Sequence, residues 1–279
     1  MRYTTVQTLL ANGFKRTTDS KKIIEIIQNY SNFINSITGQ YFYPKQKIIS
    51  NIVLDEWSRI IVAPDKIPIV KINNIIYKID NSDIQYILSP NEYIQYERYI
   101  ELEHLFQIHD IETEILIALG SSYPRFRFTL DGIFGWINKK DIPFETIIIE
   151  DFDSSKSSLK LESVDDISPK DFLTIDKYTF LVDTVDYINK VVTFDPVIVS
   201  KTVPSGTKAV SYGSIIPDIE YCAIQLCKAS AKLENNYGGR ILYEKTDRYA
   251  VKTTLSISGI SNVDMILSNY QPPLYVGFV

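Results

Sequence analysis

Two segments near the ends of the chain carry apolar residues at the three- and four-residue spacing of an amphipathic helix, at about residues 19–38 and 217–236. Between them lie about 180 residues of short β-branched blocks, separated by proline, asparagine and glycine. Such blocks are typical of strands and hairpins. The pattern therefore predicts a helical unit, built from both ends of the chain, that carries a large β-rich insert.

The first helix has both of its ends marked in the sequence. The polar run at 17–20 supplies side-chain oxygens that can cap free backbone N–H groups, and Gly39 tolerates the left-handed turn that ends a helix. Its apolar face is formed by Ile23, Ile27, Tyr30, Ile34 and Ile37. Burying such a face is worth on the order of 10 kcal/mol, which is more than an isolated helix of this length gains from its backbone. The helix must therefore pack on another one.

The second helix is the predicted partner. Pro217 suits a first helical turn, and Gly238-Gly239 marks the end. Small residues along it would let a neighbouring backbone approach closely, either from the same chain or from another subunit. The predicted subunit or helix-packing interface consists of Ile23, Ile27, Tyr30, Ile34, Ile37, Leu226 and Leu233.

Shorter elements surround these two helices. A first helix is expected over 5–12, and a last one from Ser261, which would act as its cap. The residues at 125–130 alternate cleanly and predict a strand, as do those at 250–256, whereas 93–108 could form either state. Five short strands are expected at 159–164, 172–175, 180–182, 191–194 and 209–210.

Together these elements predict an α+β fold in three parts. Residues 1–46 and 214–279 would form a helical core, residues 47–145 a β-rich region, and residues 146–213 an inserted small barrel or sandwich.

Composition narrows the class of protein. The chain has 279 residues, of which 45% are hydrophobic and 23% charged, as in an ordinary folded protein. Its net charge of −5, without a long lysine or arginine cluster, argues against gripping nucleic acid. No apolar run reaches the roughly 18 residues that span a bilayer, and the first residues lack the apolar core of a signal peptide. We therefore expect assembly in a cytoplasm.

Catalytic and metal-binding signatures are not found in the sequence. His104 and His109 are five apart, which does not place two metal ligands on one helical face. There is no phosphate-binding loop, nucleophile elbow or Cys-x-x-Cys pair, and Cys222 and Cys227 cannot bridge each other within one helix. Acidic residues cluster at 150–153 and 165–166 and are interpreted as solvated loops. We predict no cofactor, no metal and no enzymatic activity.

Several landmarks occur in a characteristic order along the chain. They are Tyr3-Thr4-Thr5-Val6, the helix that runs from Tyr30 into Thr38-Gly39-Gln40-Tyr41-Phe42, the strand Leu130–Trp136, the helix from Ile216 to Leu233, Gly239-Arg240-Ile241, and Tyr270-Gln271-Pro272-Pro273. Taken together, these landmarks resemble the head-tail connector (head completion adaptor) proteins of tailed bacteriophages, in which Gln40 stands where that family usually has arginine. The small β-module likewise resembles one that recurs in phage virion proteins.

The resemblance implies a virion structural protein. It implies a homo-oligomeric, dodecameric ring that lies between the portal and the tail or other neck proteins, and DNA that passes through the channel without sequence-specific binding. The C-terminal segment would reach toward the portal through Leu274, Tyr275, Val276, Phe278 and Val279.

Two alternatives stay open. A tyrosine-rich β-surface could belong to a tail-tip or baseplate adhesin that stacks on host surface glycan, since the chain contains 19 tyrosines. The hypothesis that the chain is a glycan hydrolase would rest only on scattered carboxylates.

Overall fold

The chain is mainly β-structure. A computed structural model describes residues 1–15, 17–54, 60–62, 67–79, 84–102, 126–236 and 258–271. Within them lie three antiparallel sheets and four helices, and more of the residues are in strands than in helices. The predicted fold class, a helical core with an inserted β-module, is therefore wrong. Helical periodicity is visible within one continuous segment, whereas the pairing of distant strands leaves no local pattern. The share of helix in the fold was therefore predicted too high.

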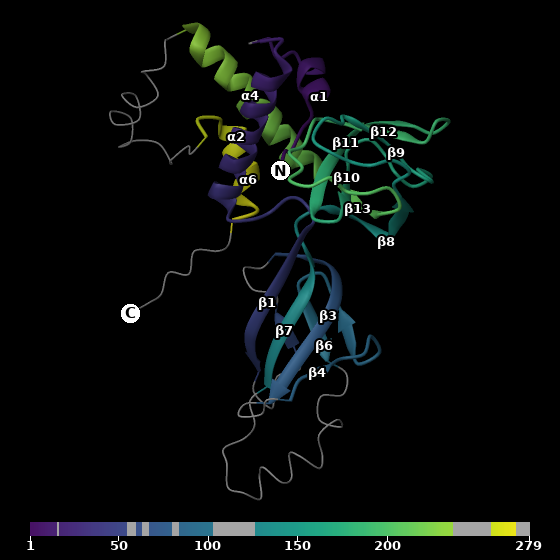
Figure 1. The fold of residues 1–279 in the computed structure, drawn as a ribbon. Coiled ribbons are helices and arrows are strands. Elements are labelled where there is room, and N and C mark those ends of the chain that lie inside the picture. The colour runs from purple at the N-terminus through teal and green to yellow at the C-terminus, as the bar shows by residue number, and fades with distance from the viewer. Residues whose placement is uncertain are drawn as a thin grey trace, which may run out of the picture. The chain divides into compact units, whose positions relative to one another are not determined.

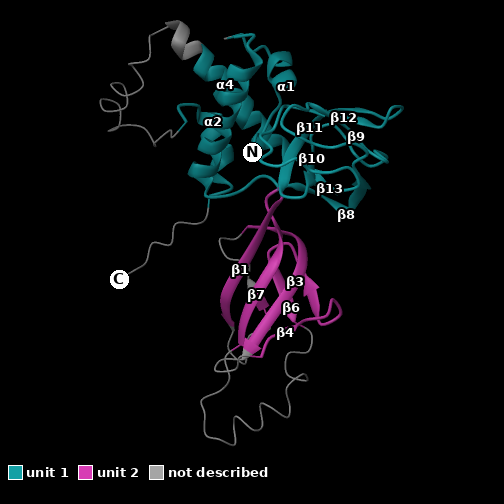
Figure 2. Cartoon of the chain, viewed as in Figure 1, with its two compact units in different colours: residues 1–43, 137–279 teal, residues 44–136 magenta. Residues whose placement is uncertain are grey.

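The chain divides into two compact units (Figure 2). Unit 1 comprises residues 1–43 and 137–279, and unit 2 comprises residues 44–136. Unit 1 thus contains the helices together with the second β-region, which the sequence analysis had assigned to separate domains.

The helices of unit 1 begin and end at specific capping residues. Asp19 accepts a hydrogen bond from the Lys21 N–H at the start of α2 (Ser20–Thr38), and Gly39 ends it with a left-handed φ of 65°. Both predicted ends are confirmed. Thr5 caps α1 (Val6–Ala11) in the same way, through the Thr8 N–H.

The last two helices, α4 (Pro217–Asn236) and α6 (Ser261–Ser268), follow later in the chain. The predicted cap of α6 is wrong, because Ile260 occupies the capping position and offers no side-chain hydrogen bond. Instead the Asp264 carboxylate accepts the Ser258 N–H at 2.8 Å.

Helix α2 packs against α4 and α6, and α1 against α2, as Figure 1 shows. Helices α1, α2 and α4 share one apolar cluster, in which the small side chain of Ala231 lies beside larger ones. Its buried members are Leu9, Phe14, Ile23, Ile27, Ile224, Cys227 and Ala231.

The other part of unit 1 is a six-stranded sheet that closes into a barrel. Its strands, in spatial order, are β8 (Asn138–Ile147), β13 (Lys208–Ser214), β10 (Asp171–Ile175), β11 (Tyr178–Asp186), β12 (Val191–Phe194) and β9 (Ser158–Lys160). The chain just beyond β8 meets the chain just beyond β9 in an antiparallel bridge between Ile148 and Leu161. Two backbone bonds flank the bridge, from the Ile149 N–H to the Lys160 carbonyl at 3.0 Å and from the Glu162 N–H to the Ile147 carbonyl at 2.9 Å.

Closure leaves the barrel without a free sheet edge along these residues. Its interior is apolar, with Phe152 packed against Phe180 and Phe194 at ring-centroid distances of 5.6 and 5.8 Å.

The N-terminal segment binds the barrel through polar contacts. The Val6 N–H donates to the Asp195 carboxylate at 3.0 Å, and the Thr5 hydroxyl donates to Asp183 at 2.6 Å. Arg2 donates to the Asp195 carbonyl at 3.1 Å. Burial raises the pKa of Asp195, and the charge of Arg2 opposes that shift. Two carboxylates of the barrel therefore anchor the start of α1.

The described residues of unit 2 form two sheets. The first has the order β1 (Lys45–Leu54), β7 (Phe126–Phe134), β3 (Ile69–Ile79) and β4 (Tyr86–Ile87). The second has the order β2 (Ile60–Val62), β6 (Tyr99–Leu102) and β5 (Tyr93–Gln95). The strand predicted at 125–130 lies largely within β7, and the ambiguous stretch from 93 to 102 is β-structure.

Candidate functional site

The first residues of the chain, the end of α2 with the turn after it, and the end of α6 meet around Tyr3. The Tyr3 N–H donates to the Ser31 hydroxyl of α2 at 3.0 Å, and its phenol donates to the Asn35 side chain. The same phenol accepts the Phe42 N–H at 3.2 Å. Burial raises the pKa of Tyr3. The first residues of the chain are thus held on α2 and on the turn that follows it.

The same cluster extends to the end of α6. Phe42 is fully buried and meets Tyr270 edge to face at 5.1 Å, and Tyr3 meets Phe42 in the same manner at 5.7 Å. Gln40 is buried, with 3% of its surface exposed. Residues from the first and last landmarks therefore form one packed group, although more than 200 positions separate them.

Most of the predicted interface residues are covered by the chain itself. Ile23, Ile27 and Ile34 are fully buried, and Leu226 is 2% exposed. Tyr30 and Ile37 are half-buried, and the side chain of Leu233 lies outside the described residues. The apolar face of α2 is therefore covered mainly by the rest of the same chain.

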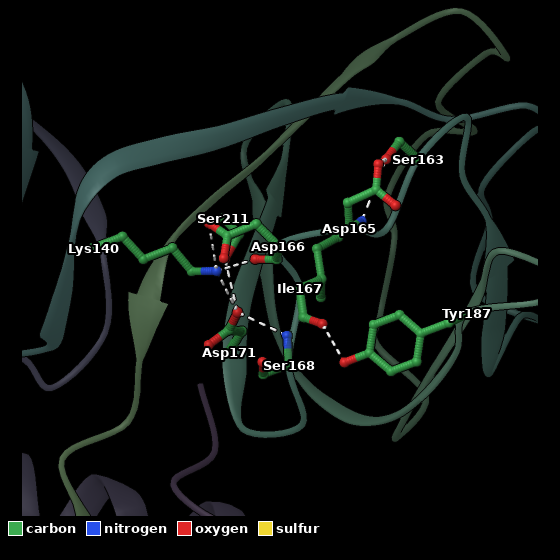
Figure 3. A network of polar contacts seen from close by, with 9 residues as sticks. All are labelled: Lys140, Ser163, Asp165, Asp166, Ile167, Ser168, Asp171, Tyr187 and Ser211. Atoms are coloured by element: carbon green, nitrogen blue, oxygen red, sulfur yellow. Dashed lines mark hydrogen bonds and ion pairs between the residues drawn. The ribbon is translucent and has the colours of Figure 1, made fainter.

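Figure 3 shows a network of polar side chains in the barrel. The Lys140 ammonium group lies 2.9 Å from the Asp171 carboxylate and 3.3 Å from that of Asp166. The side chains of Lys140 and Asp171 are only 16% and 5% exposed. Asp171 also accepts the Ser168 N–H at 3.0 Å and the Ser211 hydroxyl at 3.3 Å.

A bulge in β8 brings Lys140 to this position. The register of β8 against β13 jumps from Lys139 opposite Gly213 to Phe144 opposite Ser211. The residues between them have no partner in register, so the strand bends. The sequence analysis missed this network, because its members come from three separate strands and loops and form no motif.

The network is built for stability rather than for catalysis. Ser211 is fully buried and its hydroxyl is bound by Asp171, whereas a nucleophile must reach a substrate and a base. A buried ion pair with additional hydrogen bonds instead holds β8, β10 and β13 in one arrangement.

The two cysteines are also poor nucleophiles. Both are fully buried, and burial raises the pKa of Cys222 and of Cys227 to about 12. The thiolate is the reactive form, so the folded chain holds both sulfurs in the unreactive state.

We expect neither thiol to react with Ellman's reagent at about pH 8, where an exposed cysteine is partly ionised, as long as the chain is folded. Both should react at once in concentrated guanidinium chloride. Absorbance of the released thionitrobenzoate measures the reaction. Rapid labelling of one thiol in buffer alone would contradict the burial of α4 against α2.

In the part of the chain that the structure describes, no group of three or more histidine, cysteine, aspartate or glutamate side chains converges. In the acidic run 150–153, Glu150 pairs with Lys156 at 2.5 Å, and this hydrogen bond is the largest cause of its lowered pKa. His104, His109 and the predicted docking tail, 274–279, lie outside the described residues.

Among the described residues, none of the helices is both long and apolar enough to cross a membrane. No protein-family model, curated protein or solved structure matches this chain.

Proposed function

We propose that this chain is a structural protein of a tailed-phage virion. It acts as a head-to-tail adaptor that forms a ring between the portal and the tail, and the ring surrounds the DNA exit channel. Its partners are further copies of itself, the portal protein and a tail or neck protein. The chain works by binding, without a catalytic step or a cofactor.

The observation that carries the proposal is the cluster around Tyr3. Each landmark of the resemblance is weak as a sequence motif, but Tyr3, Phe42 and Tyr270 are in mutual or successive contact. Residues that pack against one another constrain each other's identity. The packing of these three residues therefore gives a physical reason for the landmarks to occur together in one chain.

The charge and chemistry of the chain are compatible with this role. A net charge of −5 keeps the protein from binding DNA tightly, which suits a channel through which DNA must pass. Large parts of the surface remain for contacts with neighbouring proteins, including exposed isoleucines on both units.

The test is electron microscopy with class averaging of the purified chain, alone and mixed with the portal protein from the same genome. We expect rings, either free or seated on the portal, and the class averages would give their symmetry. Monomers that do not bind the portal would contradict the proposal.

An adhesin at the tail tip is the second candidate. It is favoured by an aromatic group in unit 2, where Tyr96 stacks on Tyr99 at 4.4 Å and Arg98 lies 5.0 Å from the ring centre of Trp136. Aromatic faces of this kind can stack on sugar rings. Antibody labelling of intact virions separates the two candidates, because the adaptor must lie at the neck and the adhesin at the distal end of the tail.

A further inference from the structure

The four-stranded sheet of unit 2, drawn in Figure 1, has one buried and one exposed side. On the buried side Ile49, Leu130 and Ile75 lie opposite one another on β1, β7 and β3, and their exposed fractions are 9%, 0% and 0%. Successive residues of a strand point to opposite sides of the sheet. The residues before and after these three therefore belong to the exposed side, which we call the outer face.

The register of the strands shows that the outer face is one continuous surface. Residues that are partners across neighbouring strands stand side by side, and every second residue of a strand returns to the same side. The outer face therefore contains three adjacent rows. They are Ile48, Asp131 and Asn74 in the first row, Thr129, Ile76 and Ile87 in the middle row, and Val53, Arg127 and Lys78 in the last row.

The outer face exposes apolar side chains. Ile87 is 68% exposed, Ile48 64% and Val53 48%, while Ile76 and Thr129 are half-buried. The solvent side of an antiparallel sheet is normally polar. Apolar groups gathered on such a surface are typical of an interface with another protein.

Two charges of the outer face lack an ionic partner. Asp131 accepts a hydrogen bond from the neutral Gln46 amide at 3.4 Å, and neither Asp131 nor Lys78 forms an ion pair among the residues that the structure describes. Lys71 and Arg127 differ, because each has an interaction within its own chain. The uncharged middle row separates Asp131 in the first row from Lys78 in the last row.

We propose that the outer faces of two copies pack against each other about a two-fold axis that runs along the middle row. Stacked sheets lie about 10 Å apart, with their strands within about 30° of one another. This axis reverses the strands of the second copy and brings the first row of one copy over the last row of the other. Each Asp131 then faces the row that contains Lys78, and Ile76 and Ile87 meet their own counterparts.

The charges disfavour the other two-fold arrangement of these faces. With the axis along the strands, each row would lie over the same row of the second copy. Lys78 would then lie over Arg127, and Asp131 would be two rows away from Lys78 of the second copy. Like charges placed opposite one another across an interface are unfavourable, so the arrangement with reversed strands is the favoured one.

The size of the outer face determines how strong the contact can be. Three rows about 6.8 Å apart on strands about 4.8 Å apart cover roughly 400 Å² in each copy. The pair would bury roughly 800 Å², which is less than a stable complex buries, so we expect a reversible dimer with a dissociation constant on the order of 100 μM. An isologous contact joins two copies and cannot close a ring by itself. The inference therefore goes beyond the proposed adaptor function and does not depend on it.

Analytical ultracentrifugation of the full chain, without the portal protein, tests the pairing. We expect a monomer–dimer equilibrium in the wild type and association at least about tenfold weaker in Ile87→Lys, because the introduced ammonium groups of the two copies would meet at the axis. Ile198→Lys is the matched control. Ile198 is 91% exposed and follows β12 in the barrel, away from the outer face, so its substitution should leave association unchanged. Circular dichroism verifies that both variants are folded.

Cross-linking tests the direction of the axis. In Ile87→Cys the introduced thiols of two copies lie opposite each other, so a short bis-maleimide should produce covalent dimers. The native Cys222 and Cys227 are fully buried and should not react. In Asn74→Cys the introduced thiol lies over the last row of the second copy, about 14 Å along the strands from its counterpart, and the yield of covalent dimer should be several-fold lower.

Each outcome decides a separate point. A wild-type chain that stays monomeric well above the expected dissociation constant would overturn the pairing and leave the adaptor function standing, since that function is tested by rings on the portal. Dimers that persist unchanged in Ile87→Lys would show that the outer face is not the interface. Equal cross-linking of Ile87→Cys and Asn74→Cys would refute the two-fold arrangement. A monomeric chain that loses portal binding on Ile87→Lys would assign the outer face to the portal and refute the pairing.

Discussion

Replacing Gly213 with alanine is expected to destabilise the barrel by about 3 kcal/mol or more. Gly213 lies in β13 with a φ of 149°, a conformation that favours glycine. A Cβ atom there would lie 2.2 Å from the Asn138 carbonyl oxygen and 3.0 Å from the Lys139 Cα. These are backbone atoms of β8, which cannot move without disrupting its pairing with β13. Urea denaturation followed by circular dichroism measures the loss.

Gly206 provides the control. It also has a positive φ, 87°, but a Cβ atom there would meet nothing within 4 Å. Gly206→Ala should therefore show only the conformational cost, about 1 kcal/mol. Equal denaturation midpoints for the two variants would show that the close approach of β8 and β13 is not required.

Lys140→Met is expected to cost about 3 kcal/mol of unfolding free energy, because it leaves the Asp171 carboxylate buried without its counter-ion. The hydrogen bonds from Ser168 and Ser211 remain and keep the cost at the lower end of the usual range. Asp171→Asn should cost less, since Lys140 keeps its contact with the more exposed Asp166.

The double variant Lys140→Met with Asp171→Asn should recover much of the loss, because a neutral amide oxygen can still accept from Ser168. Denaturation of all four proteins gives the coupling energy as a double-mutant cycle. Lys208→Met serves as the control, since its pair with Glu145 is exposed, at 56% and 42%, and should contribute less than about 1 kcal/mol. If Lys140→Met costs no more than Lys208→Met, the buried pair does not stabilise the barrel.

Local signals predicted the helices well. The cap at Asp19, the end at Gly39 and the start at Pro217 each depend on chemistry within a few neighbouring residues, and the structure has all three. The predicted cap of α6 was wrong, although it also depended on neighbouring residues only. At the start of this helix the Ser258 N–H donates to the Asp264 carboxylate, and Ser261 does not cap the helix.

Long-range features could not be predicted in the same way. The closure of the barrel depends on Ile148 meeting Leu161, and the ion pair depends on Lys140 meeting Asp171, 31 positions away. Nothing in the periodicity of either segment specifies its partner. The balance of helix and strand was misjudged because many short strands, each weak in signal, outweigh a few clear helices.

The packing of α2 against α4 has a consequence for synthesis on the ribosome. About 180 residues separate the two helices, so α2 leaves the ribosome about 10–40 s before α4 at ordinary elongation rates. During that interval the faces of Ile23 and Ile27 that contact α4 are uncovered, while the barrel, which is continuous in sequence, can close as soon as β13 emerges. Nascent chains should therefore be most prone to aggregation, and most dependent on chaperones, through α2.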